Sequence, residues 1–180
     1  AVGVGVALGM RAVTELVDAT LPDARGIASF NRPGTVTLLS SNGKVIQKLG
    51  PATREKVKQG AMPLLVQQAF MAAEDRRFYD HDGVDGWGIA RAIVTNVQQG
   101  AVREGASTIT QQLARTVFLS QDRTITRKLK EAALALKLER QLSKQQILEQ
   151  YLNYVYLGSG AYGVADAAWI YYSKTPDQLT

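Results

Sequence analysis

The C-terminal half of the chain carries a nearly continuous helical pattern, which restricts the fold more than any other feature of the sequence. Apolar residues recur at helical spacing in the segments 124–140 and 144–155. The apolar stripe of the first segment consists of Ile125, Leu129, Ala132, Ala133 and Leu136. The stripe of the second consists of Ile147, Leu148, Tyr151, Leu152 and Val155. Because Ser143 and Gln146 form a capping box and Gly158 is a helix-ending residue, we predict two successive amphipathic helices.

The N-terminal half begins with a hairpin pattern. Asn42-Gly43 separates the β-prone runs 35–40 and 44–49, and this dipeptide is the strongest short-range signal for a hairpin. We therefore expect a small β-hairpin on the N-terminal side of the helical segments.

Shorter helices follow the hairpin. Pro63 suits the first position of a helix that runs toward Glu74. The charged, aromatic and glycine-containing stretch 74–88 is typical of a loop, and a short helix is expected over 89–99. The chain has no internal repeat and no low-complexity linker, so we predict one mainly α domain with a small N-terminal β-hairpin.

The composition excludes several classes of protein. Of the 180 residues, 46% are apolar and 21% are charged, the balance of an ordinary globular core. The sequence has no cysteine, which excludes disulfide scaffolds, zinc–thiolate sites and cysteine nucleophiles. The single histidine, His81, excludes metal sites built on several histidines.

Positive charge is concentrated in one part of the chain. The formal net charge is +5, which points to anionic partners such as phosphates, nucleic acid or acidic lipid. Between Arg103 and Arg140 there are eight basic and four acidic residues, so this stretch alone carries +4. An anionic ligand is therefore expected to bind there.

The first candidate for chemistry is the stretch from Glu74 to Gly83. A carboxylate just past an apolar helix is partly withdrawn from water, which suits it to general acid or base catalysis. The alternative is a solvated loop held by salt bridges, the common fate of a Glu-Asp-Arg-Arg sequence. His81 is expected to be a structural hydrogen-bonding group and not the base.

Two further candidates lie in the basic stretch. Gly105, followed by serine and threonine, opens a helix whose free N–H groups can hold an anion, although Ser and Thr cap helices everywhere. On the next helix, Glu131 lies roughly 40° from Arg127 and 60° from Lys128 around the axis, on a face opposite much of the apolar stripe. This group is either an ordinary intrahelical ion pair or a diphosphate clamp whose carboxylate holds the cations in place.

Taken together, these stretches resemble the family 51 glycosyltransferases, the peptidoglycan glycosyltransferase domain of class A penicillin-binding proteins and their monofunctional relatives. The resemblance covers roughly residues 20–176. The matching stretches are 21–23, 42–43, 74–83, 105–113, 127–131, 144–153 with Gly158, and 160–174. Each motif is moderately specific, but all of them in this order are very specific. The family fold is lysozyme-like and mostly helical, with a small mobile lobe against the membrane.

The resemblance implies a reaction and a set of site residues. The family polymerises lipid II into β-1,4-linked glycan strands, with inversion and release of undecaprenyl diphosphate. Glu74 would be the general base, and Glu131 would orient cations or assist the donor side. The other implied substrate-binding residues are Asp75, Phe78, His81, Ser107, Thr108, Gln111, Gln112, Arg115, Arg127, Lys128 and Lys144. Of these, Arg115, Arg127 and Lys128 would stabilise the leaving diphosphate.

Three positions depart from the family pattern. Ala106 stands where a second glycine is usual, Arg115-Thr116 replaces the common Lys-Asn, and Tyr172-Ser173 replaces Phe-Gly. These departures affect the details of donor contacts and leave the reaction class unchanged.

The resemblance also implies partners and a location. The partners would be lipid II, the growing glycan strand, a bacterial plasma membrane and a following transpeptidase domain, with no nucleic acid and with the catalytic domain on the periplasmic face. No organic cofactor is expected; a divalent cation, Mg²⁺ or Mn²⁺, fits beside the diphosphate, although the sequence contains no all-protein metal cage. Residues 87–102 would supply part of the membrane-proximal lobe. Its lipid-facing side would consist of Trp87, Ile89, Ile93 and Val94, for which a core position is an equally good alternative.

The first ten residues form an apolar and glycine-rich run too short to span a membrane alone. We interpret residues 1–21 as the end of a membrane anchor with a juxtamembrane segment, against a buried segment or a signal-peptide remnant. Residues 22–180 would be the glycosyltransferase domain, truncated at its C-terminal end.

Two rival functions fit parts of the same sequence. A lysozyme-like glycoside hydrolase would also use Glu74, as a general acid, but its neutral leaving group needs no cationic clamp. A basic helical module that binds nucleic acid or anionic membrane would explain the charge and leave the Glu74 loop unexplained.

Overall fold

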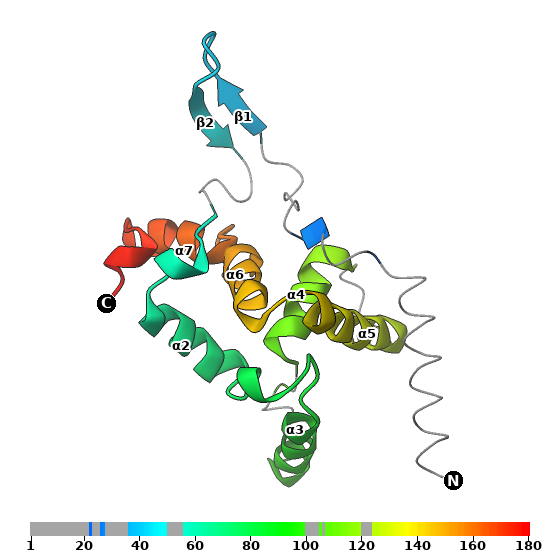
Figure 1. The fold of residues 1–180 in the computed structure, drawn as a ribbon. Coiled ribbons are helices and arrows are strands. Elements are labelled where there is room, and N and C mark those ends of the chain that lie inside the picture. Colours follow the sequence, from blue (N-terminus) through cyan, green and yellow to red (C-terminus); the bar gives the residue numbers. More distant parts are fainter. Residues whose placement is uncertain are drawn as a thin grey trace.

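The computed structural model describes residues 22, 26–27, 36–49, 56–99, 105, 107–119 and 124–180. Its helices confirm the mainly α prediction (Figure 1). The α-helices are α2 (Leu64–Glu74), α3 (Gly86–Gln99), α4 (Ile109–Phe118), α5 (Ile125–Gln141), α6 (Lys144–Tyr154) and α7 (Gly163–Tyr172). The 3₁₀ turns are η2 (Gln59–Ala61), η3 (Phe78–Asp80) and η4 (Pro176–Gln178).

The predicted hairpin is present and projects away from the helices (Figure 1). Strands β1 (Val36–Leu39) and β2 (Val45–Leu49) pair antiparallel, with an irregularity between Leu38 and Leu39. In the turn, Gly43 has a φ of +80°, which glycine adopts at no steric cost, and the Ser40 hydroxyl donates to Asn42 Oδ1 at 2.5 Å. Local turn chemistry therefore suffices to specify this element.

The core is built where α4 packs against α5 and α6. Helix α4 contributes Ile109 and Leu113 to this core and α5 contributes Leu134 and Leu138, and all four are at most 1% exposed. From α6 the core receives Ile147, Leu148, Tyr151, Leu152 and Tyr154. The second predicted stripe is thus confirmed, with Val155 partly buried at its edge, and the capping box of Ser143 and Gln146 is formed.

The stripe predicted for the first of these helices is wrong. On α5 Leu129 is 67% exposed and Leu136 is 36% exposed. The buried face instead carries Glu131, Leu134, Ala135 and Leu138, at spacings of three and four residues. The helix-wheel prediction puts Glu131 with Arg127 and Lys128 on a face opposite much of the apolar stripe, but in the structure Glu131 is buried. Its neighbours Arg127 and Lys128 offset the cost of burying a carboxylate by pairing with it, which allows the helix to turn its charged group inward.

Two helix boundaries also differ from the prediction. Helix α3 begins at Gly86, three residues earlier than expected, within the stretch predicted as a loop. The carboxylate of Asp85 lies over its first turn, since a Cβ at Gly88 would be only 2.7 Å from Asp85 Oδ2. Helix α6 ends at Tyr154, before Gly158, because the chain turns back there and pairs Tyr156 with Tyr162.

Helix α3 lies at the opposite end of the molecule from the hairpin (Figure 1). Trp87 is 74%, Val94 54% and Ile89 36% exposed, so the alternative that these side chains form a core is wrong. The side chain of Ile93 and residues 1–21 lie outside the described part of the chain. No helix among the described residues is long and apolar enough to cross a membrane.

Candidate active site

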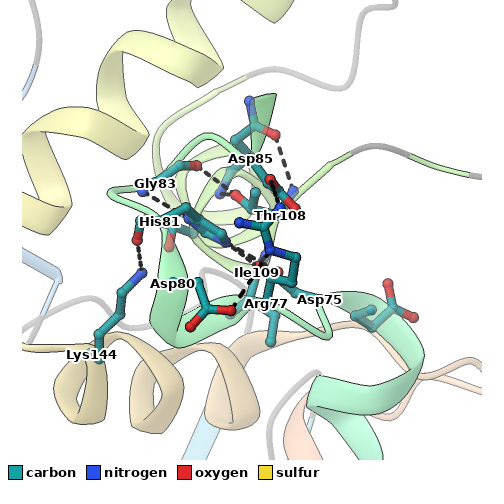
Figure 2. Close-up of polar contacts among 12 residues, drawn as sticks. Asp75, Arg77, Asp80, His81, Gly83, Asp85, Thr108, Ile109 and Lys144 are labelled. Atoms are coloured by element: carbon teal, nitrogen blue, oxygen red, sulfur yellow. Dashed lines mark hydrogen bonds and ion pairs between the residues drawn. The ribbon is translucent and has the colours of Figure 1, made fainter. Parts of the chain in front are cut away.

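The loop after α2 is fixed to the start of α4 by the buried carboxylate of Asp75 (Figure 2). Its Oδ2 accepts a 3.0 Å hydrogen bond from the backbone N–H of Ile109, the first residue of α4. His81 Nε2 lies 3.1 and 3.0 Å from the two carboxylate oxygens, and His81 Nδ1 accepts from the Gly83 N–H at 3.1 Å. The N-terminus of α4, predicted as an anion site, is therefore already occupied by an anion of the chain itself.

Lys144 holds the same loop from the side of α6 (Figure 2). Its Nζ donates to the His81 carbonyl at 2.5 Å and to Glu139 Oε1 at 2.8 Å, and it lies 4.5 Å from the centroid of the Phe78 ring. Phe78 is only 1% exposed and belongs to the core. The burial of Phe78 and the contacts of Lys144 favour a role in holding the loop.

Two of the predicted cleft residues form the cap of α4. Thr108 and Gln111 make a reciprocal capping box, and each is 2% exposed. The Thr108 hydroxyl also donates to the Gly83 carbonyl at 2.6 Å, which joins the cap to the Asp75 loop. Gln111 is thereby committed to the backbone, whereas Ser107 and Gln112 on either side remain partly accessible.

Glu74, the last residue of α2, is exposed beside this anchored loop. Its Oε2 accepts a 2.8 Å hydrogen bond from Gln112 Nε2, and Gln112 Oε1 lies 3.3 Å from the Tyr151 hydroxyl, which donates to it. Burial raises the pKa of Tyr151 well above its usual value; the charge of Glu74 raises it further, and Arg115 opposes this. The tyrosine therefore stays protonated. Glu74 thus presents an accessible carboxylate, as general acid or base catalysis requires.

The predicted cationic face is assembled around Glu131, which is fully buried. Arg127 Nη1 lies 2.8 Å from Glu131 Oε2, and the Lys128 ammonium pairs with Oε1 of the same carboxylate. Lys128 Nζ also donates to the Ser107 hydroxyl at 2.9 Å. The Lys128 side chain is 46% exposed, so its charge remains available to a ligand while Glu131 fixes its position.

A cavity of about 270 Å³ lies beside Glu74, and Ser107 is among the residues that line it. Its lining includes Glu74 and Asp75, Gly105, Ser107 and Thr108, and Arg91 of α3. Ser107 is both a wall residue of this cavity and the hydrogen-bond partner of Lys128. The exposed carboxylate therefore shares this cavity with Ser107, and Ser107 is joined by a hydrogen bond to Lys128 of the cationic face, 53 to 57 positions from Glu74 in the sequence.

Sequence reasoning missed several residues that shape this site. Tyr151 was assigned to an apolar stripe, Glu139 was not singled out, and Arg91 lay in a helix expected to face lipid. A buried tyrosine is a signal in its own right, because its hydroxyl needs a partner. Glu139 and Arg91 carry no comparable signal, since charged residues on helices are usually solvated.

The described residues contain no group of three or more His, Asp or Glu side chains placed to hold a metal ion. Asp75 is engaged by Ile109 and His81, and Asp85 lies 3.4 Å from Arg77. The acidic residues near the cavity are therefore largely committed to partners within the chain.

Comparison with known proteins places the chain in a family. The family model described as Transglycosylase matches residues 42–180. The chain belongs to the transglycosylase family. It is 47% identical over 174 residues, 96% of its length, to penicillin-binding protein 1A of Neisseria flavescens, and 45% identical over 164 residues, 91% of its length, to penicillin-binding protein 1A of Escherichia coli K12. It spans 22% and 19% of those two proteins, about a fifth of each.

Membership of the transglycosylase family confirms the resemblance drawn from the motifs and is consistent with the lysozyme-like helical fold.

Proposed function

We propose that this chain is a peptidoglycan glycosyltransferase unit that polymerises lipid II into glycan strands. The 4-hydroxyl of the acceptor N-acetylglucosamine attacks C1 of N-acetylmuramic acid on the growing chain. The C1–O bond to the lipid diphosphate breaks, with inversion to a β-1,4 bond, and undecaprenyl diphosphate leaves. Glu74 takes the hydroxyl proton. The observation that carries the proposal is the cavity that the accessible Glu74 shares with Ser107, whose hydroxyl accepts a hydrogen bond from Lys128 of the cationic face.

The second requirement of this reaction is stabilisation of the negative charge on the leaving group. Negative charge grows on the diphosphate as the C1–O bond breaks, and cations held in advance stabilise it without reorganisation. Arg127 and Lys128 supply such cations, since the buried Glu131 holds both at fixed positions. Arg115, partly buried on α4, is a third candidate. The clamp argues against a hydrolase, whose leaving group is neutral.

The remaining predicted residues divide by their contacts. Ser107 and Gln112 are accessible enough to contact the donor, and Thr108 lines the cavity from the cap of α4. The loop that follows Glu74 and the adjoining cap of α4 are held by five other predicted residues, Asp75, Phe78, His81, Gln111 and Lys144. A Mg²⁺ or Mn²⁺ ion would be held chiefly by phosphate oxygens, because Asp75 and Asp85 already have partners.

The membrane-proximal role falls to α3 in this proposal. Its exposed Trp87 and Val97, 74% and 76% accessible, suit contact with the lipid phase that carries the substrate. A bacterial plasma membrane with the domain on its outer face, an anchor in residues 1–21 and a transpeptidase domain in the full protein remain part of the same proposal.

Incubation of the full-length protein with labelled lipid II, followed by gel separation of the products, tests the function. We expect the wild type to make a polymer that muramidase digests and Glu74→Gln to make none. Asp82→Asn is the matched control, because Asp82 is an exposed acid of the same loop outside the cavity.

Two other outcomes would overturn the proposal. Release of soluble disaccharide from purified cell wall, with no polymer from lipid II, would establish the hydrolase instead. Salt-sensitive DNA binding that is unchanged in Glu74→Gln, again without polymer, would establish a nucleic-acid-binding module.

A further inference from the structure

A chain of three side chains leads from the core of the molecule to the exposed Glu74. Tyr151 is 2% exposed on α6, and its hydroxyl donates to Gln112 Oε1 on α4 at 3.3 Å. The other end of the same amide, Gln112 Nε2, donates to Glu74 Oε2 at 2.8 Å. Glu74 lies on α2, Gln112 on α4 and Tyr151 on α6, so this row of hydrogen bonds joins three helices. The bonded residues are 38 and 39 positions apart in the sequence.

The direction of these hydrogen bonds is fixed by chemistry. An ionised carboxylate only accepts, so Gln112 must turn its NH₂ group toward Glu74 and its carbonyl toward Tyr151. A glutamine turned the other way would set two acceptors against each other and push the carboxylate away. A protonated tyrosine is the donor that satisfies the carbonyl, and burial keeps this tyrosine protonated by raising its pKa.

Only the hydroxyl of Tyr151 reaches the site. Its ring packs edge-on against Phe70, with centroids 6.2 Å apart, and lies within the core cluster. The charged groups that act on the hydroxyl are Glu74, Arg115 and Asp75. The ring of Tyr151 therefore contributes to packing, and its hydroxyl contributes separately to the row of hydrogen bonds.

We propose that Tyr151 is a positioning residue for the transfer reaction, which holds the Gln112 amide in the orientation that presents the Glu74 carboxylate to the acceptor hydroxyl. The proposal rests on the function proposed above. Tyr151 touches neither substrate nor reacting atoms. Its contribution is geometric, because a base displaced by a fraction of an ångström transfers a proton less efficiently.

Steady-state kinetics of Tyr151→Phe in the full-length protein, with lipid II as substrate, provide the first measurement. We expect kcat to fall roughly five- to tenfold with KM changed less than about twofold, since the hydroxyl is remote from substrate binding. Tyr154→Phe is the matched control. This substitution removes a hydroxyl from the same helix, but that hydroxyl donates to the Ile27 carbonyl at 3.3 Å. The Tyr154→Phe variant should therefore retain the wild-type kcat.

A double-mutant cycle then separates positioning from packing. In a Gln112→Ala background the hydroxyl has no amide to orient, so adding Tyr151→Phe should lower kcat less than about twofold further. A structural role would persist in that background and would appear as a lower melting temperature. Equal losses in both backgrounds, or a wild-type kcat in Tyr151→Phe, would overturn the proposal. If the wild type itself makes no polymer, the proposed function fails instead.

Discussion

Glu74 and Glu131 are the same residue type in opposite surroundings. Glu74 is exposed at the end of α2, with a neutral amide as the partner of its carboxylate. Glu131 is fully buried on α5, and its two oxygens are taken by Arg127 and Lys128. A carboxylate that must exchange a proton has to remain accessible, whereas one that holds cations in place gains from burial, where charges interact more strongly.

The comparison also separates two ways of positioning a carboxylate. Glu131 is fixed by its own ion pairs within a single helix. Glu74 is fixed from a distance, because its neighbour Asp75 anchors the loop to α4 and Gln112 contacts the carboxylate. We therefore expect the two glutamates to respond differently to the same substitution, in activity and in stability.

Glu74→Gln should have the largest effect on activity. The amide cannot take a proton from the acceptor hydroxyl, so we expect polymerisation to fall by at least about a thousandfold. Because the side chain is exposed, the melting temperature should stay close to that of the wild type. Lipid II turnover and thermal melts check both points, and an active Glu74→Gln would refute its assignment as the base.

Glu131→Gln should have a smaller effect on rate and a larger one on stability. Removing one partner of a buried ion pair costs about 3 kcal/mol and leaves Arg127 and Lys128 without their anchor. We expect a loss of roughly a hundredfold in turnover together with a lower midpoint of chemical denaturation. A variant that melts like the wild type would show that the buried pairs contribute nothing to the fold.

Lys128→Ala tests the cationic side directly. It removes one charge next to Ser107 and leaves the pair between Arg127 and Glu131 intact. We expect kcat to fall about tenfold, equivalent to about 1.4 kcal/mol of transition-state stabilisation. Lys130→Ala is the control, since Lys130 is an exposed cation on the same helix. An equal loss of kcat in both variants would show that the net positive charge of the helix matters, and not the position of Lys128 beside the leaving group.

The smallest predicted effect is a change in the stability of the protein at high pH, and it depends on Tyr151. Because folding raises the pKa of this tyrosine above its ordinary value of 10.0, the unfolded state loses the proton first as the pH rises. The stability contributed by protonated Tyr151 is therefore complete below pH 10 and declines above it. Denaturation of the wild type and Tyr151→Phe between pH 8 and 11 should show the wild type losing more stability. Parallel curves would contradict this.

Local features of the fold could be predicted from the sequence. The hairpin turn at Asn42-Gly43 and the capping box at Ser143 depend on residues within four positions of one another, so their chemistry is visible in the sequence. The stripe on α5 could not be predicted in the same way. A hydropathy pattern treats every glutamate as polar. It therefore cannot show that ion pairs with Arg127 and Lys128 allow Glu131 to be buried.

The sequence by itself determined the helical class, the family and the residue types at the site: an acid after an apolar helix, and two cations with a second acid on one helix. Only the tertiary structure decided which contacts hold these residues in place. Asp75 occupies the start of α4, Lys144 holds the loop, and Gln112 joins Tyr151 to Glu74, across separations of 34 to 63 residues. Such contacts depend on which helix faces pack together, and that is settled by burial of the whole core.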